Sequence, residues 1–382
     1  MNDRRRCSRC ILPDGYPGIT FDSNGVCNYC RMFDERVTDR RKERTESDFL
    51  EAVRGGRKGN PKYDALVGIS GGKDSCYTLH AMVKQYGFTV LAYTFDNGFF
   101  TEGAKDNIAK VVSKLGVEHR FVGVPKDLED RLYRALIKKG CGDLCIVCSN
   151  GVLSATIDLA LREKVYKVIW GLSPRTEPIL PFEMLDAYDF TYMSHVAAPE
   201  VLKEELYPYR YCSLRSASLA TFLHRVRFVF LPEYVEWPEK EISTLLKREY
   251  DWRDYGQGTS HFDCLVNPAM NYFLNRRFGV SKVAEKMSTL VRSGQITREE
   301  ALERERREDS FEEPIEAVDV LCNRLNITRE DLEPYLQGNT VDYRSFKNTA
   351  SLLQKLSPLF LLTARLGLTT PSLYYKYRLP KT

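Results

Sequence analysis

The stretch from Tyr63 to Ser75 constrains the fold more than any other part of the chain. It reads Tyr-Asp-Ala-Leu-Val-Gly-Ile-Ser-Gly-Gly-Lys-Asp-Ser. The apolar run from Ala65 to Ile69 is typical of a buried parallel strand, and it breaks at Ser70-Gly71-Gly72 before a helical pattern opens at Asp74. The sequence therefore predicts a strand, a glycine turn and a helix N-terminus in direct succession.

This turn has the chemistry of a phosphate cradle. Gly71 and Gly72 lack Cβ atoms, so their backbone N–H groups can approach an anion closely beside the positive end of the helix dipole. Ser70 and Ser75 add hydroxyl donors, and Lys73 adds a mobile positive charge. The stretch matches neither Gly-x-x-x-x-Gly-Lys-[Ser/Thr] nor Gly-x-Gly-x-x-Gly. The alternative is a glycine-rich turn that carries surface charges.

Composition bounds the class of protein. The chain has 382 residues, which predicts about two or three domains. Its 43% hydrophobic and 28% charged residues are ordinary for a soluble globular protein, and the net charge of +4 permits nucleic-acid binding without arguing for it. We find no apolar stretch of membrane-spanning length and no secretory signal at Met1 to Cys7, so we expect a cytoplasmic protein without a membrane partner.

Strands and helices alternate after the cradle. We expect helices at 76–86, 102–115 and 128–139, and strands at 89–95, 119–122 and 165–170. This alternation predicts a doubly wound, mostly parallel α/β sheet. Ligands bind outside the carboxyl ends of such strands, so Asp96 should lie at the same edge of the sheet as the phosphate cradle. Asx-Gly is also a common turn, which is the alternative for Asp96-Asn97-Gly98.

Seven of the eleven cysteines fall into two clusters. Cys7-x-x-Cys10 and Cys27-x-x-Cys30 are two knuckles whose spacing suits a structural zinc ion held by four thiolates. So small a segment would take its folding energy from the metal. The alternative is four free thiols.

The second cluster contains Cys141, Cys145 and Cys148, and a helical pattern follows it. Cys145 and Cys148 are three residues apart, so their sulfurs point the same way on a helix, and Cys264 could complete a set of three. Three thiolates with an open fourth position suit a [4Fe–4S] cluster. His261, close to Cys264, is a further candidate ligand or nucleophile. The alternative is buried cysteines that act as small apolar side chains.

Four regions follow from these patterns. We expect a zinc-ribbon module at 1–35, a charged helix or linker at 36–62, a nucleotide domain at 63–235 and a mainly helical region at 236–382. Capping boxes should open helices after Thr297 and Thr328. A helix at 350–366, with a break near Pro358, should pack against the body or a second subunit, which leaves a homodimer open.

Ser70-Gly-Gly-Lys-Asp-Ser75 resembles the loop of the PP-loop, or N-type, ATP pyrophosphatases. That resemblance implies ATP and Mg²⁺ as ligands and adenylation, with release of pyrophosphate, as the reaction. It assigns Lys73 and Asp74 to catalysis and implies an ATP site built from two further strand ends. At the first strand end, Phe95, Asp96 and Asn97 would approach adenine or ribose. At the second, Gly171, Ser173 and Arg175, together with Glu177, would approach phosphate or substrate.

Two groups within that superfamily fit. The N-terminal knuckles, the loop and residues 293–302 resemble N-acetyl sugar amidotransferases, which implies a sugar substrate and ammonia from a glutaminase partner. Cys145, Cys148 and Cys264 resemble the cysteine set of thiolating PP-loop enzymes, a group that includes tRNA 2-thiolation enzymes. This second resemblance implies that the three cysteines are catalytic and that the enzyme uses a sulfur donor.

We favour sulfur transfer narrowly, with amidine formation as the alternative. We expect a small-molecule substrate rather than tRNA. A third alternative is a zinc-ribbon RNA-binding protein without catalytic activity.

Overall fold

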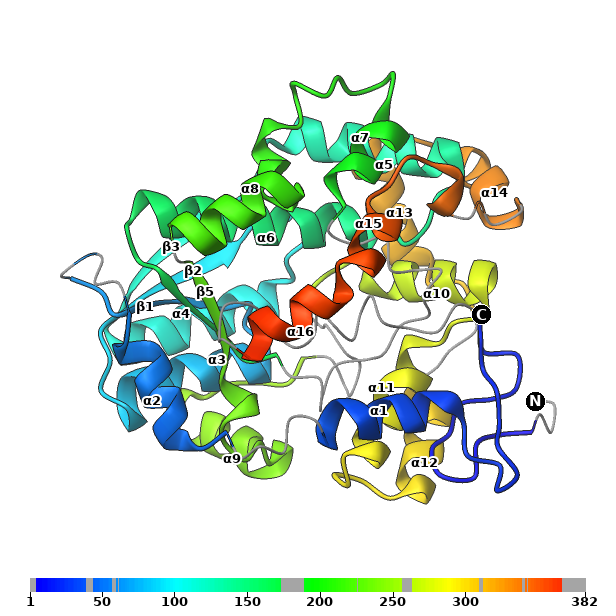
Figure 1. Ribbon diagram of the computed structural model, residues 1–382. Helices are drawn as coiled ribbons and strands as arrows, with labels where there is room; N and C mark the ends of the chain where they lie inside the picture. The colour runs from blue at the N-terminus through cyan, green and yellow to red at the C-terminus, as the bar shows by residue number, and fades with distance from the viewer. Residues whose placement is uncertain are drawn as a thin grey trace.

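A five-stranded parallel sheet forms the centre of the protein (Figure 1). The computed structural model describes residues 5–38, 44–56, 60, 62–172, 189–224, 226–255, 263–308, 312–338, 341 and 343–365. The strand order is β3-β2-β1-β4-β5, and every neighbouring pair is parallel. The strands are β1 Ala65–Gly68, β2 Val90–Phe95, β3 Glu118–Val122, β4 Lys167–Trp170 and β5 Arg227–Phe230.

Helices cover both faces of the sheet. The alternation of side chains along β1 explains this, because Ala65 and Val67 pack into one apolar cluster and Leu66 packs into another. The first face is covered by α2 Glu46–Arg54, α3 Lys73–His80 with its π-helical extension η1 Ala81–Gln85, α4 Glu102–Leu115 and α9 Glu239–Tyr250. The second face is covered by α6 Cys145–Arg162 and η4 Leu219–Leu223.

The predicted doubly wound α/β sheet is confirmed. The helix at 102–115 has the bounds that the sequence predicted, and the other expected elements of the sheet domain agree within a few residues. Strand β5 was not predicted from the sequence. The short elements α7 Phe190–Ala197, η3 Tyr207–Cys212, α8 Leu214–Ser218 and η5 Leu231–Glu233 were missed as well.

A second layer of helices lies beyond the carboxyl edge of the sheet. It contains α5 Lys126–Lys139, α10 Asn267–Phe278, α13 Ile315–Leu325, α14 Arg329–Gln337 and the turn η6 Tyr343–Ser345. These helices share one apolar cluster with α6 and α7. The capping box at Thr328 and Asp331 is present at the start of α14. The expected break near Pro358 is also confirmed, since α15 Ala350–Lys355 is followed by α16 Ser357–Arg365.

The N-terminal knuckles share a core with helices from the other end of the sequence. Ile11 and Tyr16 pack in one apolar cluster with Met287 and Leu290. The helices concerned are α1 Asn28–Thr38, α11 Lys282–Arg292 and α12 Arg298–Glu308, which lie together in Figure 1. The sequence analysis treated residues 1–35 as a separate module, and those domain boundaries stay a prediction.

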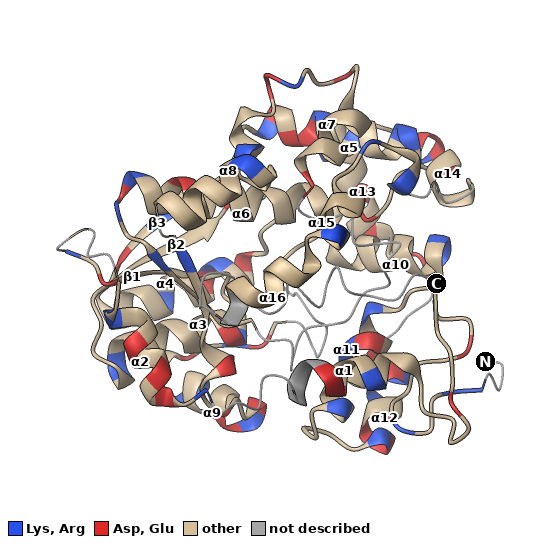
Figure 2. Ribbon diagram, in the orientation of Figure 1, with Lys and Arg blue, Asp and Glu red and all other residues tan. Residues whose placement is uncertain are grey.

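Charge and apolarity are distributed unevenly over the helices. Figure 2 shows basic and acidic residues interspersed on most of them, which agrees with a small net charge. On α15 and α16 the side chains of Leu352, Leu359 and Leu362 are about half exposed.

In the part of the chain that the structure describes, α6 is the one helix long and apolar enough to cross a membrane. More than half of it is buried inside the protein, as in an ordinary core helix.

Candidate nucleotide site and cysteine clusters

The predicted cradle lies at the carboxyl end of β1. Its two serines close the loop, because the backbone N–H of Ser70 donates to Ser75 Oγ at 3.0 Å and Ser75 Oγ donates to the carbonyl of Gly72 at 3.0 Å. Helix α3 then begins at Lys73, with Gly72 as its N-cap residue. The loop therefore has the strand-turn-helix geometry of an anion site.

Only glycine suits position 71, for two reasons. Its φ is +83°, and a Cβ atom there would lie 2.4 Å from the carbonyl oxygen of Ala104 on α4. Two side chains donate to the Gly71 carbonyl, Asn107 Nδ2 at 3.2 Å and Trp252 Nε1 at 2.9 Å. The turn is thus held from α4 and from the segment after α9.

Lys73 and Asp74 are each held by a partner from the segment around the start of α9. Lys73 Nζ lies 2.8 Å from Glu239 Oε1, and Trp237 Nε1 donates to Asp74 Oδ1 at 2.8 Å. Burial favours the protonated form of Glu239, but the Lys73 charge holds the pKa of this carboxyl below its usual range. Lys73 Nζ also lies 3.7 Å from Asp74 Oδ1, so two carboxylates balance the charge of this ammonium group.

Asp96 and Asn97 follow β2 at the same edge of the sheet. The N–H of Gly98 donates to Asp96 Oδ1 at 2.8 Å, and Lys126 Nζ lies 3.4 Å from that oxygen. Burial favours the protonated acid, yet this hydrogen bond and the Lys126 charge hold the pKa of Asp96 below its usual range. The N–H of Phe99 donates to Asn97 Oδ1 at 2.9 Å, so the turn is closed twice.

The three cysteines of the predicted set occupy one neighbourhood beside Asn97. Asn97 Nδ2 donates to Cys148 Sγ at 3.6 Å. Cys264 forms an antiparallel bridge with Phe100, which places it next to the same turn. Burial raises the pKa of Cys148 to about 12 and that of Cys145 well above its usual value, and the nearby Cys264 adds to both shifts. Burial thus disfavours the thiolate form of both side chains.

The set is not as compact as the N-terminal one. Among the residues that the structure describes, Cys145, Cys148 and Cys264 are not a group whose ligand atoms all lie within 4.8 Å of one another. Cys145 has a cationic neighbour, since Lys282 Nζ lies 3.8 Å from its sulfur and 3.3 Å from Asp143 Oδ2.

The remaining predicted site residues divide into two groups. Gly171 follows β4 and packs against α3, where a Cβ atom would lie 2.4 Å from Thr78 Oγ1. Phe95 ends β2, and its ring approaches Gly151 on α6. Ser173, Arg175, Glu177 and His261 lie outside the described residues.

Comparison with known proteins finds partial similarity to two curated enzymes. Two curated relatives match: a glutamine-hydrolysing GMP synthase of Pyrobaculum aerophilum is 31% identical over 88 residues, and the tRNA-specific 2-thiouridylase MnmA of Pediococcus pentosaceus is 32% identical over 116 residues. These stretches cover 23% and 27% of this chain but 16% and 30% of the relatives. Both relatives are PP-loop enzymes. Over these stretches the chain is similar to enzymes of the PP-loop ATP pyrophosphatase superfamily.

Two other comparisons concern this protein. Residues 234–357 match the family model described as the C-terminal domain of LPS biosynthesis protein WbpG-like proteins. The solved structure of the U34-tRNA thiolase NcsA from Methanococcus maripaludis with its [4Fe-4S] cluster aligns over 88% of this chain and 92% of its own. The identity is 15% and the TM-score 0.31, a similarity too low to carry an argument.

The protein also contains a compact candidate metal centre. The sulfurs of Cys7, Cys10, Cys27 and Cys30 are buried and all lie within 4.8 Å of one another. The backbone N–H groups of Cys10 and Cys27 donate to Cys7 Sγ at 3.4 and 3.2 Å. The three neighbouring thiols, and to a smaller extent the N–H of Cys10, lower the pKa of Cys7. Four convergent sulfurs fit a tetrahedral metal ion.

A buried ion pair supports this centre from α11. Arg292 Nη2 lies 3.5 Å from Cys10 Sγ, and Arg292 Nη1 lies 2.8 Å from Glu285 Oε1. Both charged side chains are fully buried. The sequence analysis missed Arg292, because no local pattern connects it to cysteines about 280 residues earlier. It missed Trp237, Glu239 and Asn107 at the PP-loop for the same reason.

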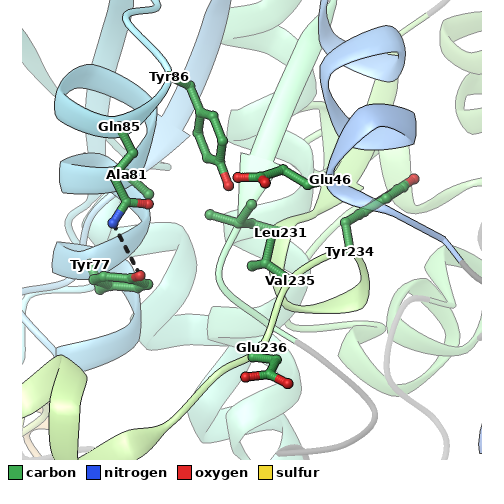
Figure 3. A pocket seen from close by; sticks show the side chains of 9 residues that line it. All are labelled: Glu46, Tyr77, Ala81, Gln85, Tyr86, Leu231, Tyr234, Val235 and Glu236. Atoms are coloured by element: carbon green, nitrogen blue, oxygen red, sulfur yellow. Dashed lines mark hydrogen bonds between the residues drawn. The ribbon is translucent and has the colours of Figure 1, made fainter.

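A surface pocket on the flank of α3 is separate from the PP-loop. It has a volume of about 340 Å³ and is lined mainly by tyrosines, glutamates and aliphatic residues (Figure 3). Tyr77 of α3 lies on one side of it and Glu46 of α2 on the other. Its lining contains none of the predicted site residues. We assign it no part in the chemistry.

Proposed function

We propose that this PP-loop protein is an ATP-dependent adenylating transferase that activates an amide oxygen and then replaces it. The observation that carries the proposal is the loop at the end of β1. Its glycine backbone, two linked serines and Lys73 stand at a helix N-terminus, the arrangement that an entering triphosphate needs.

The first step is a substitution at phosphorus. Lys73 would leave Glu239 and pair with the β- and γ-phosphates, while the N–H groups of the loop hold the departing oxygens. The amide oxygen attacks the α-phosphorus, the bond to the bridging oxygen breaks, and pyrophosphate leaves. Mg²⁺, when bound, spreads the charge of the phosphates. The product is an O-adenylate whose carbon accepts a nucleophile.

We propose nitrogen as the incoming atom and an acetamido sugar as the acceptor. The match of residues 234–357 to a family described by LPS biosynthesis supports a sugar of a surface polysaccharide. Ammonia, from a glutaminase partner, would add to the activated carbon, lose a proton and expel AMP, which leaves an amidine. This proposal reverses the narrow preference for sulfur from the sequence, because that preference rested on three cysteines alone.

Sulfur transfer is the second candidate. The position of Cys145, Cys148 and Cys264 around Asn97 favours it, as does the MnmA relative, a tRNA-specific 2-thiouridylase. In this candidate function the three thiols would hold three corners of a [4Fe–4S] cluster, which would supply an open iron for a sulfur donor. Here the substrate would gain a thioamide or thiocarbonyl group.

Mass spectrometry of the product separates the candidates. The anaerobically purified protein is incubated with ATP and nucleotide-linked acetamido sugars, together with either an ammonium salt or sulfide. We expect an amidine with ammonium, and Cys148→Ser should retain it. A thioamide that requires all three cysteines would overturn nitrogen transfer. Binding of bulk tRNA without ATP turnover would instead favour the RNA-binding alternative.

Zinc is our proposal for the N-terminal centre, as a structural ion. Four thiolates leave no open coordination position for substrate, and the four sulfurs are buried. We also propose a cytoplasmic location, because both ATP and reduced thiols are available there.

A further inference from the structure

Arg324 joins the C-terminal helices to the turn after β2. Its side chain extends from the last turn of α13, and Nη1 donates to the carbonyl oxygen of Asn97. The guanidinium carbon lies 4.1 Å from the centre of the Phe99 ring. With only 15% of the side chain exposed, this cation is part of the interior beside the turn.

Two carboxylates of α5 fix the direction of this guanidinium. Arg324 Nε lies 2.8 Å from Asp130 Oδ1, and Arg324 Nη2 lies 3.1 Å from Glu129 Oε2. Glu129 is fully buried, and its Oε1 has no hydrogen-bond partner among the described residues. Because a planar guanidinium bonded at three positions cannot rotate freely, Nη1 must point at the turn.

The turn has little room to adopt another shape. Gly98 has a φ of +74°, and a Cβ atom at this position would lie 2.6 Å from Arg324 Nη1. Lys126 Nζ donates to the carbonyl of Asp96 at 2.5 Å from the other side. The guanidinium and the ammonium group thus hold successive carbonyls of the turn, which in turn directs the side chains of Asp96 and Asn97.

We propose that Arg324 is a positioning residue through which α13 sets the nucleoside-binding edge of the PP-loop site. The inference rests on the proposed function and on the resemblance to PP-loop enzymes, which implies that Asp96 and Asn97 approach the adenosine. The phosphates are held by the separate loop at Ser70 to Ser75. Arg324 should therefore affect recognition of the nucleoside and leave recognition of pyrophosphate alone.

The test uses the double variant Arg324→Met with Glu129→Gln. Arg324→Met alone would remove the closer of the two cations beside the buried Glu129 and leave only Lys126, at 3.8 Å, which would destabilise the fold, whereas the double variant is neutral at both positions. Calorimetric titration of the full chain with ATP, AMP and pyrophosphate should give about tenfold weaker binding of ATP and AMP and unchanged binding of pyrophosphate.

Arg134→Met is the matched control. Arg134 also connects α5 to α13, since its Nη1 donates to the carbonyl of Leu325 at 3.0 Å, but no bond from it to the turn is formed. It should bind all three ligands as the wild type does. Equal ATP affinity in the double variant and the wild type would overturn the role of Arg324, as would a parallel loss of pyrophosphate binding. Absence of ATP binding in the wild type would instead overturn the proposed function.

Discussion

Gly71 shows how a single missing Cβ atom shapes the nucleotide site. Alanine at this position would adopt a left-handed φ, which costs about 1 kcal/mol, and would overlap the Ala104 carbonyl at 2.4 Å. Gly71→Ala should therefore lower the free energy of unfolding by ~3 kcal/mol and abolish pyrophosphate release. Thermal unfolding and a pyrophosphate assay measure both effects.

Gly87→Ala is the control for that change. Gly87 has a φ of +69°, so it shares the backbone strain, but nothing lies within 4 Å of the position of its Cβ atom. We expect a loss of about 1 kcal/mol and full activity. If Gly71→Ala and Gly87→Ala have the same free energy of unfolding, close packing against α4 does not restrict the loop at Ser70 to Ser75.

Glu129 should make the stability of the protein depend on pH. Burial raises its pKa to about 7, against the opposing charges of Lys126 and Arg324 and with a contribution from Asp130. The folded state therefore binds the proton more tightly than the unfolded state. This stabilises the protein at low pH by ~3 kcal/mol, and the stabilisation is lost as the pH rises from about 4.5 through 7.

Denaturant unfolding at a series of pH values checks this prediction. Glu129→Gln mimics the protonated acid and should remove the decline in stability between pH 5 and pH 7 that the wild type shows. Other groups whose charges act on Glu129 could alter the slope, and both proteins contain all of them. A decline that persists unchanged in the variant would show that another residue causes it.

At the scale of elements, the metal centre and α11 should fold as a unit. Arg292 of α11 contacts Cys10 Sγ, and the knuckles share their apolar core with that helix. Cys27→Ser should lose the zinc and increase hydrogen exchange both in residues 5–38 and in α11. Elemental analysis and exchange mass spectrometry measure the two effects.

Cys322→Ser provides the comparison, because Cys322 is buried on α13 outside the metal centre. This variant should keep one zinc per chain and leave exchange in α11 unchanged. Full zinc in Cys27→Ser would show that the metal binds elsewhere. Unchanged protection of α11 in a zinc-free variant would show that the helix folds independently of the knuckles.

The elements that the sequence predicts well have strong local signals. Helix α4 has a threonine N-cap at its start and a left-handed glycine at its end, and both of its boundaries were found. Strand β5 was missed, because its four residues have no clear alternation and follow a stretch without turn signals. The elements that build the PP-loop were predicted from the motif, while those that support it were not.

At the scale of the whole molecule, sequence reasoning found residues of the candidate site and missed their partners. Cys264 was grouped with Cys145 and Cys148 by type, and the structure brings it to the same turn through pairing with Phe100. Arg324, Glu239 and Arg292 were not found. Each of these residues lies more than 160 residues from its partner in the sequence. Their contacts therefore depend on tertiary packing, which no local sequence pattern encodes.

The central claim is that the loop at Ser70 to Ser75 makes pyrophosphate rather than orthophosphate leave from ATP. Chromatography of the nucleotides, after incubation of the full chain with ATP, acetamido sugars and an ammonium salt, tests this most directly. We predict that the wild type forms AMP and pyrophosphate in equal amounts and that Lys73→Ala forms neither product. Lys84→Ala is the control and should behave as the wild type does, because Lys84 is an exposed residue of η1, the extension of α3. Formation of ADP and orthophosphate, or unchanged AMP formation by Lys73→Ala, would contradict it.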